Sequence, residues 1–288
     1  MATKKTEALA VAEDFRIVNR YEGMDPDLLA ELNDQMDDLD DDDGILCRRI
    51  KVPAGGTLAF EVQGEEEDDV NYEKEVSGVI VFTHRVNAYW PFSYGTGDDE
   101  NKAPICSSTD GKTGVRADTG EVISCETCPY NEYGSGTNKD GSASRGKACK
   151  NMRRVYLLMD GDPNIYLLII PPTSIRDVNK QLKKIIASGV PYTGQIVSFT
   201  LAKERNRDGI EFSKVLVAKK QPLPAATASM AKELRGEVKK QYQAIAITYG
   251  DYAQEDAAPA GGVTPTAKPG EFTEVEPAAA DDGALPFN

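Results

Sequence analysis

Residues 153–171 read RRVYLLMDGDPNIYLLIIP and carry the clearest fold signal in the chain. Two runs rich in branched and aromatic side chains, 153–159 and 164–171, flank the turn Asp160-Gly161-Asp162-Pro163. Short apolar runs on either side of an Asp-Gly turn are typical of a β-hairpin. The stretch therefore predicts two paired strands within a sheet.

Further strand-like runs lie before and after this hairpin. They are ILCRRIKV at 45–52, TLAFEVQ at 57–63, EVSGVIVFTHRV at 75–86, GQIVSFTLA at 194–202 and IEFSKVLVA at 210–218. Apolar side chains at helical spacing predict a helix over 173–187 and a second over 226–246. Strands, a helix and a closing hairpin in this order are expected of an OB-type barrel. We therefore expect a mainly β fold with α additions.

The charges divide the chain into three parts. The whole sequence has 33 Lys and Arg against 47 Asp and Glu, which argues against coating of nucleic acid through bulk positive charge. Residues 1–45 hold 14 acids and 4 bases, whereas residues 139–220 hold 16 bases and 7 acids. We expect an acidic N-terminal arm at 1–45, a core at 46–250 and a disordered, Ala- and Pro-rich acidic tail at 251–288.

Several functional classes lack their sequence signatures. No run of 18 apolar residues and no apolar signal-peptide core occur, so we expect a cytoplasmic address and no membrane partner. Walker-type loops, G-x-G-x-x-G after a strand and H-E-x-x-H are also missing from the sequence. This pattern favours a binding protein over an enzyme.

Four cysteines predict a metal site. They follow the spacing Cys106-x18-Cys125-x2-Cys128-x20-Cys149, and the segments between them are polar and rich in Gly, Ser and Thr. A C-x2-C pair with two outlying cysteines in a cytosolic chain is typical of Zn²⁺ with four thiolate ligands, which leaves no open position for catalysis. We predict structural zinc that organises an insertion at about 100–150; a redox or Fe–S role and free thiols are the alternatives.

Aromatic and basic residues near this insertion suggest a nucleic-acid site. Four aromatic side chains lie within six residues, namely Tyr89, Trp90, Phe92 and Tyr94. They are candidates for base stacking, and core packing is the alternative. The candidate phosphate-binding residues are Lys150, Arg153, Arg154, Lys203, Arg205 and Arg207.

The tail ends in a recognisable motif. Its residues Asp281, Asp282, Leu285, Pro286 and Phe287 stand in the order DDGALPF, with Asn288 after the Phe. This end resembles the acidic, Pro-Phe tip of bacterial and phage single-stranded DNA-binding proteins. The resemblance implies that the tip docks on replication and repair proteins.

A second resemblance covers more of the chain. The stretch from Cys106 to Lys220, with CETCPYN, GKACK and LLIIPPTS, looks like the phage class of single-stranded DNA-binding proteins with a zinc-stapled insertion in an OB-type core. It implies a protein that protects and organises unpaired DNA in replication, recombination and repair. Its implied partners are single-stranded DNA, a polymerase, helicase or nuclease, and possible further copies of the chain. Two alternatives stay open: a zinc-containing accessory factor of transcription or replication that binds a polymerase, and a nuclease.

Overall fold

The computed structural model describes residues 11–18, 23–38, 47–66, 69–91, 103–137, 141–206, 209, 211–241 and 245–248. All of them belong to the unit Met1–Ala258. The strands are β1 Cys47–Lys51, β2 Phe60–Gln63, β3 Val70–Glu73, β4 Glu75–Tyr89, β5 Cys106–Ser108, β6 Thr113–Arg116, β7 Val122–Ser124, β8 Lys150–Leu158, β9 Ile165–Ile170, β10 Gln195–Arg205 and β11 Glu211–Pro222. The helices are α1 Pro26–Asp38, α2 Pro172–Ala187 and α3 Ala225–Gln241, with 3-10 turns at Pro129–Asn131 and Tyr192–Gly194.

The predicted hairpin is confirmed as β8 and β9. These strands pair antiparallel from Arg153 opposite Ile170 to Leu158 opposite Ile165. Gly161 in the connecting turn has φ 69°, a left-handed conformation that favours glycine. The predicted turn chemistry therefore sets the register of the central strands.

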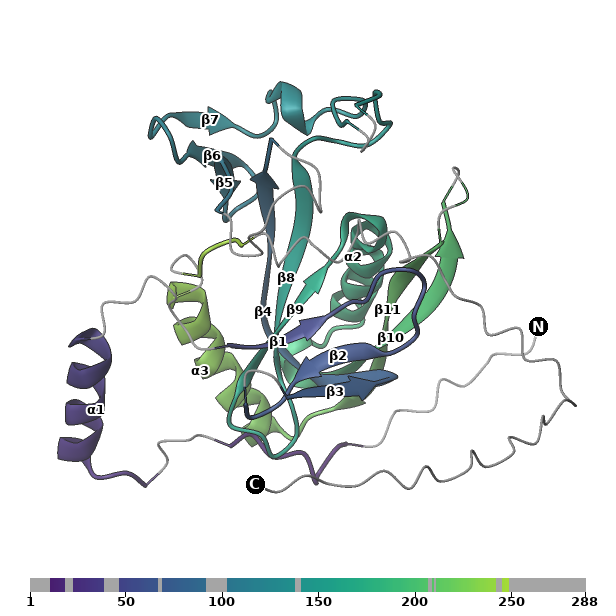
Figure 1. The fold of residues 1–288 in the computed structure, drawn as a ribbon. Helices are drawn as coiled ribbons and strands as arrows, with labels where there is room; N and C mark the ends of the chain where they lie inside the picture. Colours follow the sequence, from purple (N-terminus) through teal and green to yellow (C-terminus); the bar gives the residue numbers. More distant parts are fainter. Residues whose placement is uncertain are drawn as a thin grey trace, which may run out of the picture. The chain divides into compact units, whose positions relative to one another are not determined.

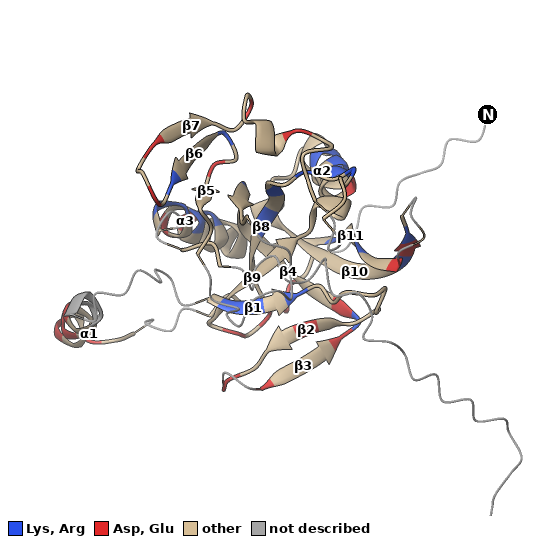
Figure 2. Cartoon of the chain, turned by 45° about the horizontal axis from the view of Figure 1, so that its top comes forward, with Lys and Arg blue, Asp and Glu red and all other residues tan. Residues whose placement is uncertain are grey.

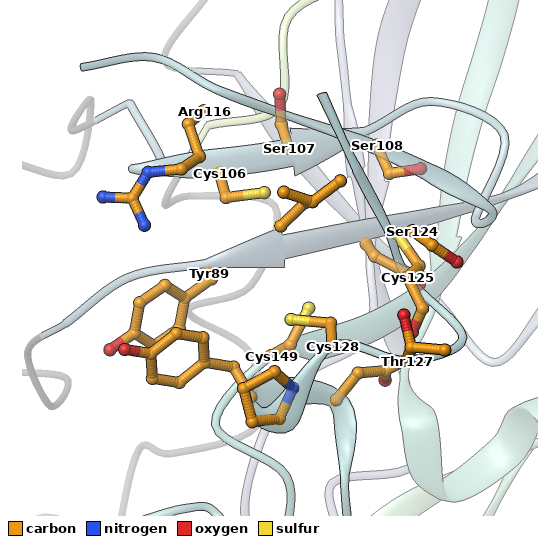
Figure 3. Close-up of a pocket in the computed structure, with 15 residues that line it drawn as sticks. Tyr89, Cys106, Ser107, Ser108, Arg116, Ser124, Cys125, Thr127, Cys128 and Cys149 are labelled. Atoms are coloured by element: carbon orange, nitrogen blue, oxygen red, sulfur yellow. The ribbon is translucent and has the colours of Figure 1, made fainter. Parts of the chain in front are cut away.

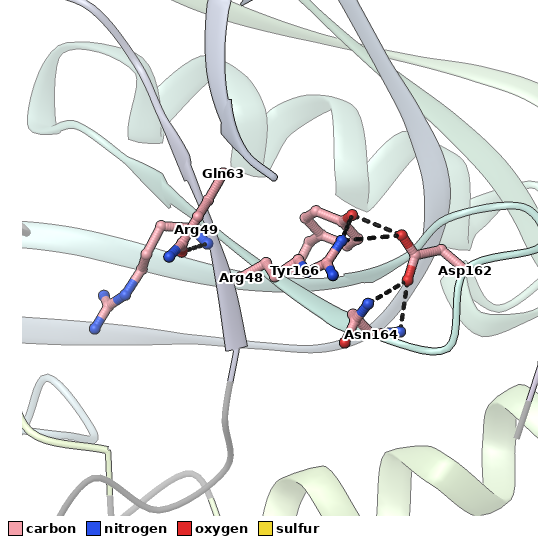
Figure 4. A network of polar contacts seen from close by, with 6 residues as sticks. All are labelled: Arg48, Arg49, Gln63, Asp162, Asn164 and Tyr166. Atoms are coloured by element: carbon pink, nitrogen blue, oxygen red, sulfur yellow. Dashed lines mark hydrogen bonds and ion pairs between the residues drawn. The ribbon is translucent and has the colours of Figure 1, made fainter. Parts of the chain in front are cut away.

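A polar network fixes this turn to the neighbouring strand β1 (Figure 4). The Tyr166 hydroxyl donates a 2.7 Å hydrogen bond to Oδ2 of Asp162 and accepts one from Arg48. The other Asp162 oxygen accepts from the backbone and side-chain nitrogens of Asn164, both at 2.7 Å. Arg48 lies opposite Tyr166 in the parallel β1–β9 ladder, so the network joins the two strands. Tyr166 therefore has a structural role in joining β9, β1 and the turn.

The long strand β4 is the centre of the sheet (Figure 1). The strand order is β3-β2-β1-β9-β8-β4-β5-β6-β7, and β10 pairs with both β4 and β11. β10 pairs with residues 75–79 of β4, whereas β5 pairs with residues 87–89 at its opposite end. β4 thus passes from the main sheet into the small sheet β5-β6-β7, which belongs to the predicted insertion.

The mainly β fold is confirmed, but the sheet is not closed into a barrel. Among the described residues no ladder joins β2 or β3 to β11. The two sides do approach each other, because Oγ of Ser213 in β11 donates a 2.8 Å hydrogen bond to the carbonyl of Thr57, before β2. Side-chain contacts of Ser213 with Thr57, and of Lys203 in β10 with Gly56, stand where a closed barrel would have a ladder.

Two helices cover opposite faces of the sheet. Val178, Leu182 and Ile185 of α2 pack into one apolar cluster with residues of β1, β2, β4, β8, β9, β10 and β11. Ala231 and Val238 of α3 pack into the other cluster, with residues of β4, β8 and β9. Full burial of such a branched aliphatic side chain contributes about 1.5–3 kcal/mol. These two clusters therefore supply most of the driving force for placing the helices.

The sequence pattern accounts for both helices. The predicted helix over 173–187 is α2, which begins at Pro172, a residue suited to the first helical position. The second prediction, 226–246, is confirmed over most of its length by α3, which ends at Gln241. Ile245 lies beyond the helix end and is buried at 4% exposure in the α3-side cluster. No helix of the described segments has both the length and the apolar composition needed to cross a membrane.

Candidate nucleic-acid interface

All four predicted zinc ligands line one cavity of about 310 Å³ (Figure 3). Cys106 begins β5, Cys125 follows β7, Cys128 precedes a 3-10 turn and Cys149 precedes β8. Gly114 of β6 lies between two of them: a Cβ there would be 3.0 Å from Sγ of Cys106 and 3.6 Å from Sγ of Cys125. A side chain at this position would press on the Cys106 thiol, so glycine leaves room for it beside β6.

The four thiols influence one another electrostatically. Burial foremost, and then the neighbouring thiols Cys125, Cys128 and Cys106, raise the pKa of the Cys149 thiol to about 12. Burial also raises the pKa of Cys106, with additional contributions from Cys125 and Cys128. Ionising all four would therefore place like charges together in a buried cavity, which is favourable only beside a cation.

The donor chemistry of this cavity fits zinc. Four thiols are a donor set that tetrahedral Zn²⁺ prefers, at about 2.3 Å from each sulfur. In the part of the chain that the structure describes, no three His, Cys, Asp or Glu side chains meet closely enough to form a metal-binding group. The four thiols line one cavity, and they are the residues that would hold a zinc ion there.

Asn131 ties the cysteine region to the main sheet. Its Nδ2 donates a 2.6 Å hydrogen bond to the carbonyl of Cys125. Its Oδ1 accepts from Nδ2 of Asn151 in β8 and from Nζ of Lys147, both at 3.0 Å. Asn151 also donates to Oδ1 of Asn87 in β4 at 2.9 Å. The insertion is thus held against β4 and β8 by buried or half-buried amide contacts.

A large basic cleft of about 990 Å³ lies beside the cysteine cavity, and Cys149 lines both. Helix α2, strands β4 and β8 and the insertion contribute its walls. Every charged residue among the described ones that line it is basic, namely Arg85, Lys147, Lys150, Arg176, Lys180, Lys183 and Lys184. Figure 2 shows Lys and Arg gathered on α2 and on the adjoining part of β8. The cleft is therefore a strongly cationic concavity in a chain of net charge −14.

The basic residues of the cleft owe their position to simple periodicities. Arg176, Lys180, Lys183 and Lys184 recur at three- and four-residue intervals, so they share one face of α2 while Val178 and Leu182 face the core. Within the described residues, no ion pair involves Arg85, Arg176, Lys180, Lys183 or Lys184. No salt bridge within the described residues neutralises these charges, although Arg176 and Lys180 also interact electrostatically with the Asp177 carboxylate.

The predicted phosphate-binding residues fall into three environments. Lys150 lines the cleft. Arg153 lies opposite Arg85 in the β4–β8 ladder and donates a 3.0 Å hydrogen bond to Oγ1 of Thr83; burial and then Arg85 lower its pKa.

Arg154 is 0% exposed and donates to the carbonyls of residues 245 and 246 at 2.9 and 2.6 Å. Arg154 therefore anchors the segment after α3, and its placement corrects the prediction of a phosphate contact.

The remaining predicted cations belong to a different surface. Lys203 and Arg205 of β10 form ion pairs with Glu211 of β11 at 2.5 and 2.7 Å, and neither lines the cleft. Glu211 therefore neutralises part of the positive charge of Lys203 and Arg205. Arg207 lies outside the described residues.

The four residues of the predicted aromatic run also lie in different parts of the molecule. Tyr89 lines the cysteine cavity and stacks on Tyr130, with ring centroids 4.3 Å apart. Trp90 is 5% exposed and belongs to the α3-side core, which corrects its expected role as a stacking surface. Phe92 and Tyr94 lie outside the described residues, as do the tip residues Asp281, Asp282, Leu285, Pro286 and Phe287.

The remaining cysteine, Cys47, and the only histidine, His84, are half-buried in strands of the sheet. Burial raises the pKa of the Cys47 thiol to about 11. Burial lowers the pKa of His84 to about 4, and its Nδ1 lies 2.7 Å from the carbonyl of Thr109. At neutral pH, Cys47 is therefore a thiol and His84 a neutral ring, which is the opposite of an activated nucleophile with a base.

Sequence reasoning missed most of the cleft. The pattern that predicts a helix over 173–187 gives no indication of which other segment faces its lysines. The missed residues are Arg85, Tyr133, Lys147, Arg176, Lys180, Lys183 and Lys184. Their common signal is the three- and four-residue spacing of bases along α2, combined with Lys147 and Lys150 on either side of Cys149.

Comparison with family models, with curated proteins and with solved structures gives no match to this chain.

Proposed function

We propose that the protein binds single-stranded nucleic acid, single-stranded DNA foremost, with the sugar-phosphate backbone in the basic cleft. The observation that carries the proposal is the acid-free lining of that cleft, from Arg85 on β4 to Lys183 on α2. Phosphate contacts from Lys and Arg supply most of the sequence-independent affinity for nucleic acid. A concave site with cations on several walls suits a chain of phosphates better than a single anion.

The cysteine cavity supports this function indirectly. We propose that Cys106, Cys125, Cys128 and Cys149 hold a structural zinc ion, which supplies the cohesion that the polar insertion lacks. Asn131 then transmits this order to the cleft, because it contacts both the Cys125 carbonyl and Lys147. The metal would shape one wall of the binding site and take no part in a reaction.

The finer parts of the proposal rest on the sequence. We propose that the sheet is an open form of the OB-type arrangement, in which a side-chain contact between Ser213 and Thr57 stands where a ladder would close the barrel. We also propose that the acidic tail recruits replication, recombination or repair proteins through residues 281–287, as the phage class does. Its carboxylates would compete with DNA phosphates for the same cations.

Titration with labelled single strands, duplex DNA and RNA at two ionic strengths tests the proposal. Single-stranded DNA should bind at low salt, and log Kobs should fall against log[salt] with a slope of about −0.7 for each phosphate neutralised. If folded, zinc-loaded protein binds none of the three ligands at low salt, the proposal is wrong. Cleavage of the strands would point instead to a nuclease.

A further inference from the structure

Tyr133 is held in an exposed position at the cleft. Its side chain is 84% exposed, the highest value among the exposed large hydrophobic residues in the described segments, and it lines the basic cleft. The backbone beside it is tightly bonded: the amide of Gly134 donates to the carbonyls of Arg145 and Gly146 at 3.2 and 3.0 Å. An exposed ring on a well-anchored turn is pre-organised for contact with a ligand, because little backbone freedom is left to lose.

One face of this ring is already covered by a cation. Nζ of Lys147 lies 5.0 Å from the centroid of the Tyr133 ring. The same Nζ donates to Oδ1 of Asn131 at 3.0 Å, so Lys147 is fixed in place from a second direction. The arrangement places a flat π surface and a phosphate-binding charge side by side at the edge of one cleft.

We propose that Tyr133 stacks on a base of the bound strand and so makes the cleft selective for unpaired nucleic acid. The inference rests on the proposed function and adds the residue that recognises bases. In a single strand, bases and phosphates alternate, so a backbone lying on the cations of α2 leaves bases free to reach an aromatic ring. In a duplex, both faces of an internal base are already stacked on its neighbours. The charges of the cleft alone would not distinguish the two ligands.

Another exposed tyrosine provides a matched control. Tyr72 on the edge strand β3 is 70% exposed, but it lies opposite Glu61 and next to Glu73. This acidic setting disfavours a nucleic-acid backbone. The two Tyr→Ala substitutions therefore remove the same side chain from a basic site and from an acidic site.

The test compares Tyr133→Ala, Tyr133→Phe and Tyr72→Ala for binding to a labelled dT oligonucleotide and to an abasic oligonucleotide of equal length. Tyr133→Ala should weaken dT binding by roughly five- to a hundredfold and leave binding of the abasic strand unchanged. Tyr133→Phe and Tyr72→Ala should bind dT as the wild type does. Because both tyrosines are largely exposed, thermal unfolding of the variants should match that of the wild type.

The outcomes separate the two proposals. If wild-type protein binds dT and Tyr133→Ala binds it equally well, the stacking role is wrong and the cleft proposal stands. Equal wild-type affinity for dT and abasic strands would likewise overturn the stacking role alone. If wild-type protein binds neither strand at low salt, the proposed function fails and the stacking role fails with it.

Discussion

Nζ of Lys147 donates a 3.0 Å hydrogen bond to Oδ1 of Asn131, across the 16 residues that separate them in sequence. Asn131 in turn donates to the carbonyl of Cys125, one of the four cysteines that line the cavity. A cation of the cleft is therefore positioned by a side chain bonded to the candidate metal centre. The order of the insertion and the strength of nucleic-acid binding should change together.

Metal loss tests this coupling. Cys125→Ser should release about one equivalent of zinc, open the region from 100 to 150 to proteolysis and weaken binding of a dT oligonucleotide, because Lys147 loses its support. Cys47→Ala, which removes a thiol distant from the cavity in the α3-side core, should keep the metal. Zinc released into a chromogenic chelator, limited proteolysis and fluorescence anisotropy provide the three readings. Retained metal and retained proteolytic resistance in Cys125→Ser would argue against a structural site.

Arg154 should affect stability rather than DNA contact. Arg154→Leu leaves the carbonyls of residues 245 and 246 without their donor. The loss of the buried bond to residue 245 costs about 1–3 kcal/mol, and the loss at the exposed residue 246 costs less because water can replace the donor. Denaturant unfolding should show this loss in the free energy of unfolding. The salt dependence of DNA binding by the folded variant should equal that of the wild type. A shallower salt slope would instead indicate that Arg154 reaches phosphate.

His84 should make the protein sensitive to mild acid. Its folded pKa of about 4 lies below the ordinary value of 6.5, so the unfolded chain binds more protons between these values. The stability that neutral His84 contributes is therefore fully present above pH 6.5 and is lost as the pH falls toward 4, by at most about 3 kcal/mol. Urea unfolding at pH 7, 5.5 and 4.5 should show a steeper loss for wild type than for His84→Gln. Parallel losses would mean that His84 is not responsible, since carboxylates and thiols titrate alike in both proteins.

Removal of residues 253–288 tests the acidic tail. The truncated chain loses 7 acids and 1 base, so it should bind single strands more tightly at low salt, where competition for the cleft is strongest. It should also lose the capture of polymerase, helicase or nuclease partners. Unchanged DNA affinity together with unchanged partner capture would contradict the tail's assigned role.

Local patterns predicted the parts of the fold that depend on neighbouring residues. The Asp-Gly turn at 160–161 and the spacing of Val178, Leu182 and Ile185 were sufficient for β8–β9 and for α2. The spacing of the cysteines likewise identified residues that share one cavity. These features are set by turn chemistry, helical periodicity and the short reach of a C-x2-C loop.

Features that depend on distant segments were not predictable. Arg154 stands beside Arg153 in a basic run, yet its partners lie 91 and 92 residues away, and they turn it into the core. Trp90 looked like part of an aromatic platform, but α3-side packing buries it. The cleft forms because the insertion and α2 face each other across β4 and β8, a relationship that no single stretch of sequence encodes.

The most direct test compares two double variants that remove the same charge from different surfaces. Lys180→Gln/Lys183→Gln changes the cleft, whereas Lys203→Gln/Arg205→Gln changes the β10–β11 hairpin. Anisotropy titration with a dT oligonucleotide should show roughly tenfold weaker low-salt binding and a salt slope shallower by about 1.4 for the first variant. The second variant should bind nearly as the wild type does. Equal weakening of both, or weakening of the second alone, would contradict placement of the strand in the α2 cleft.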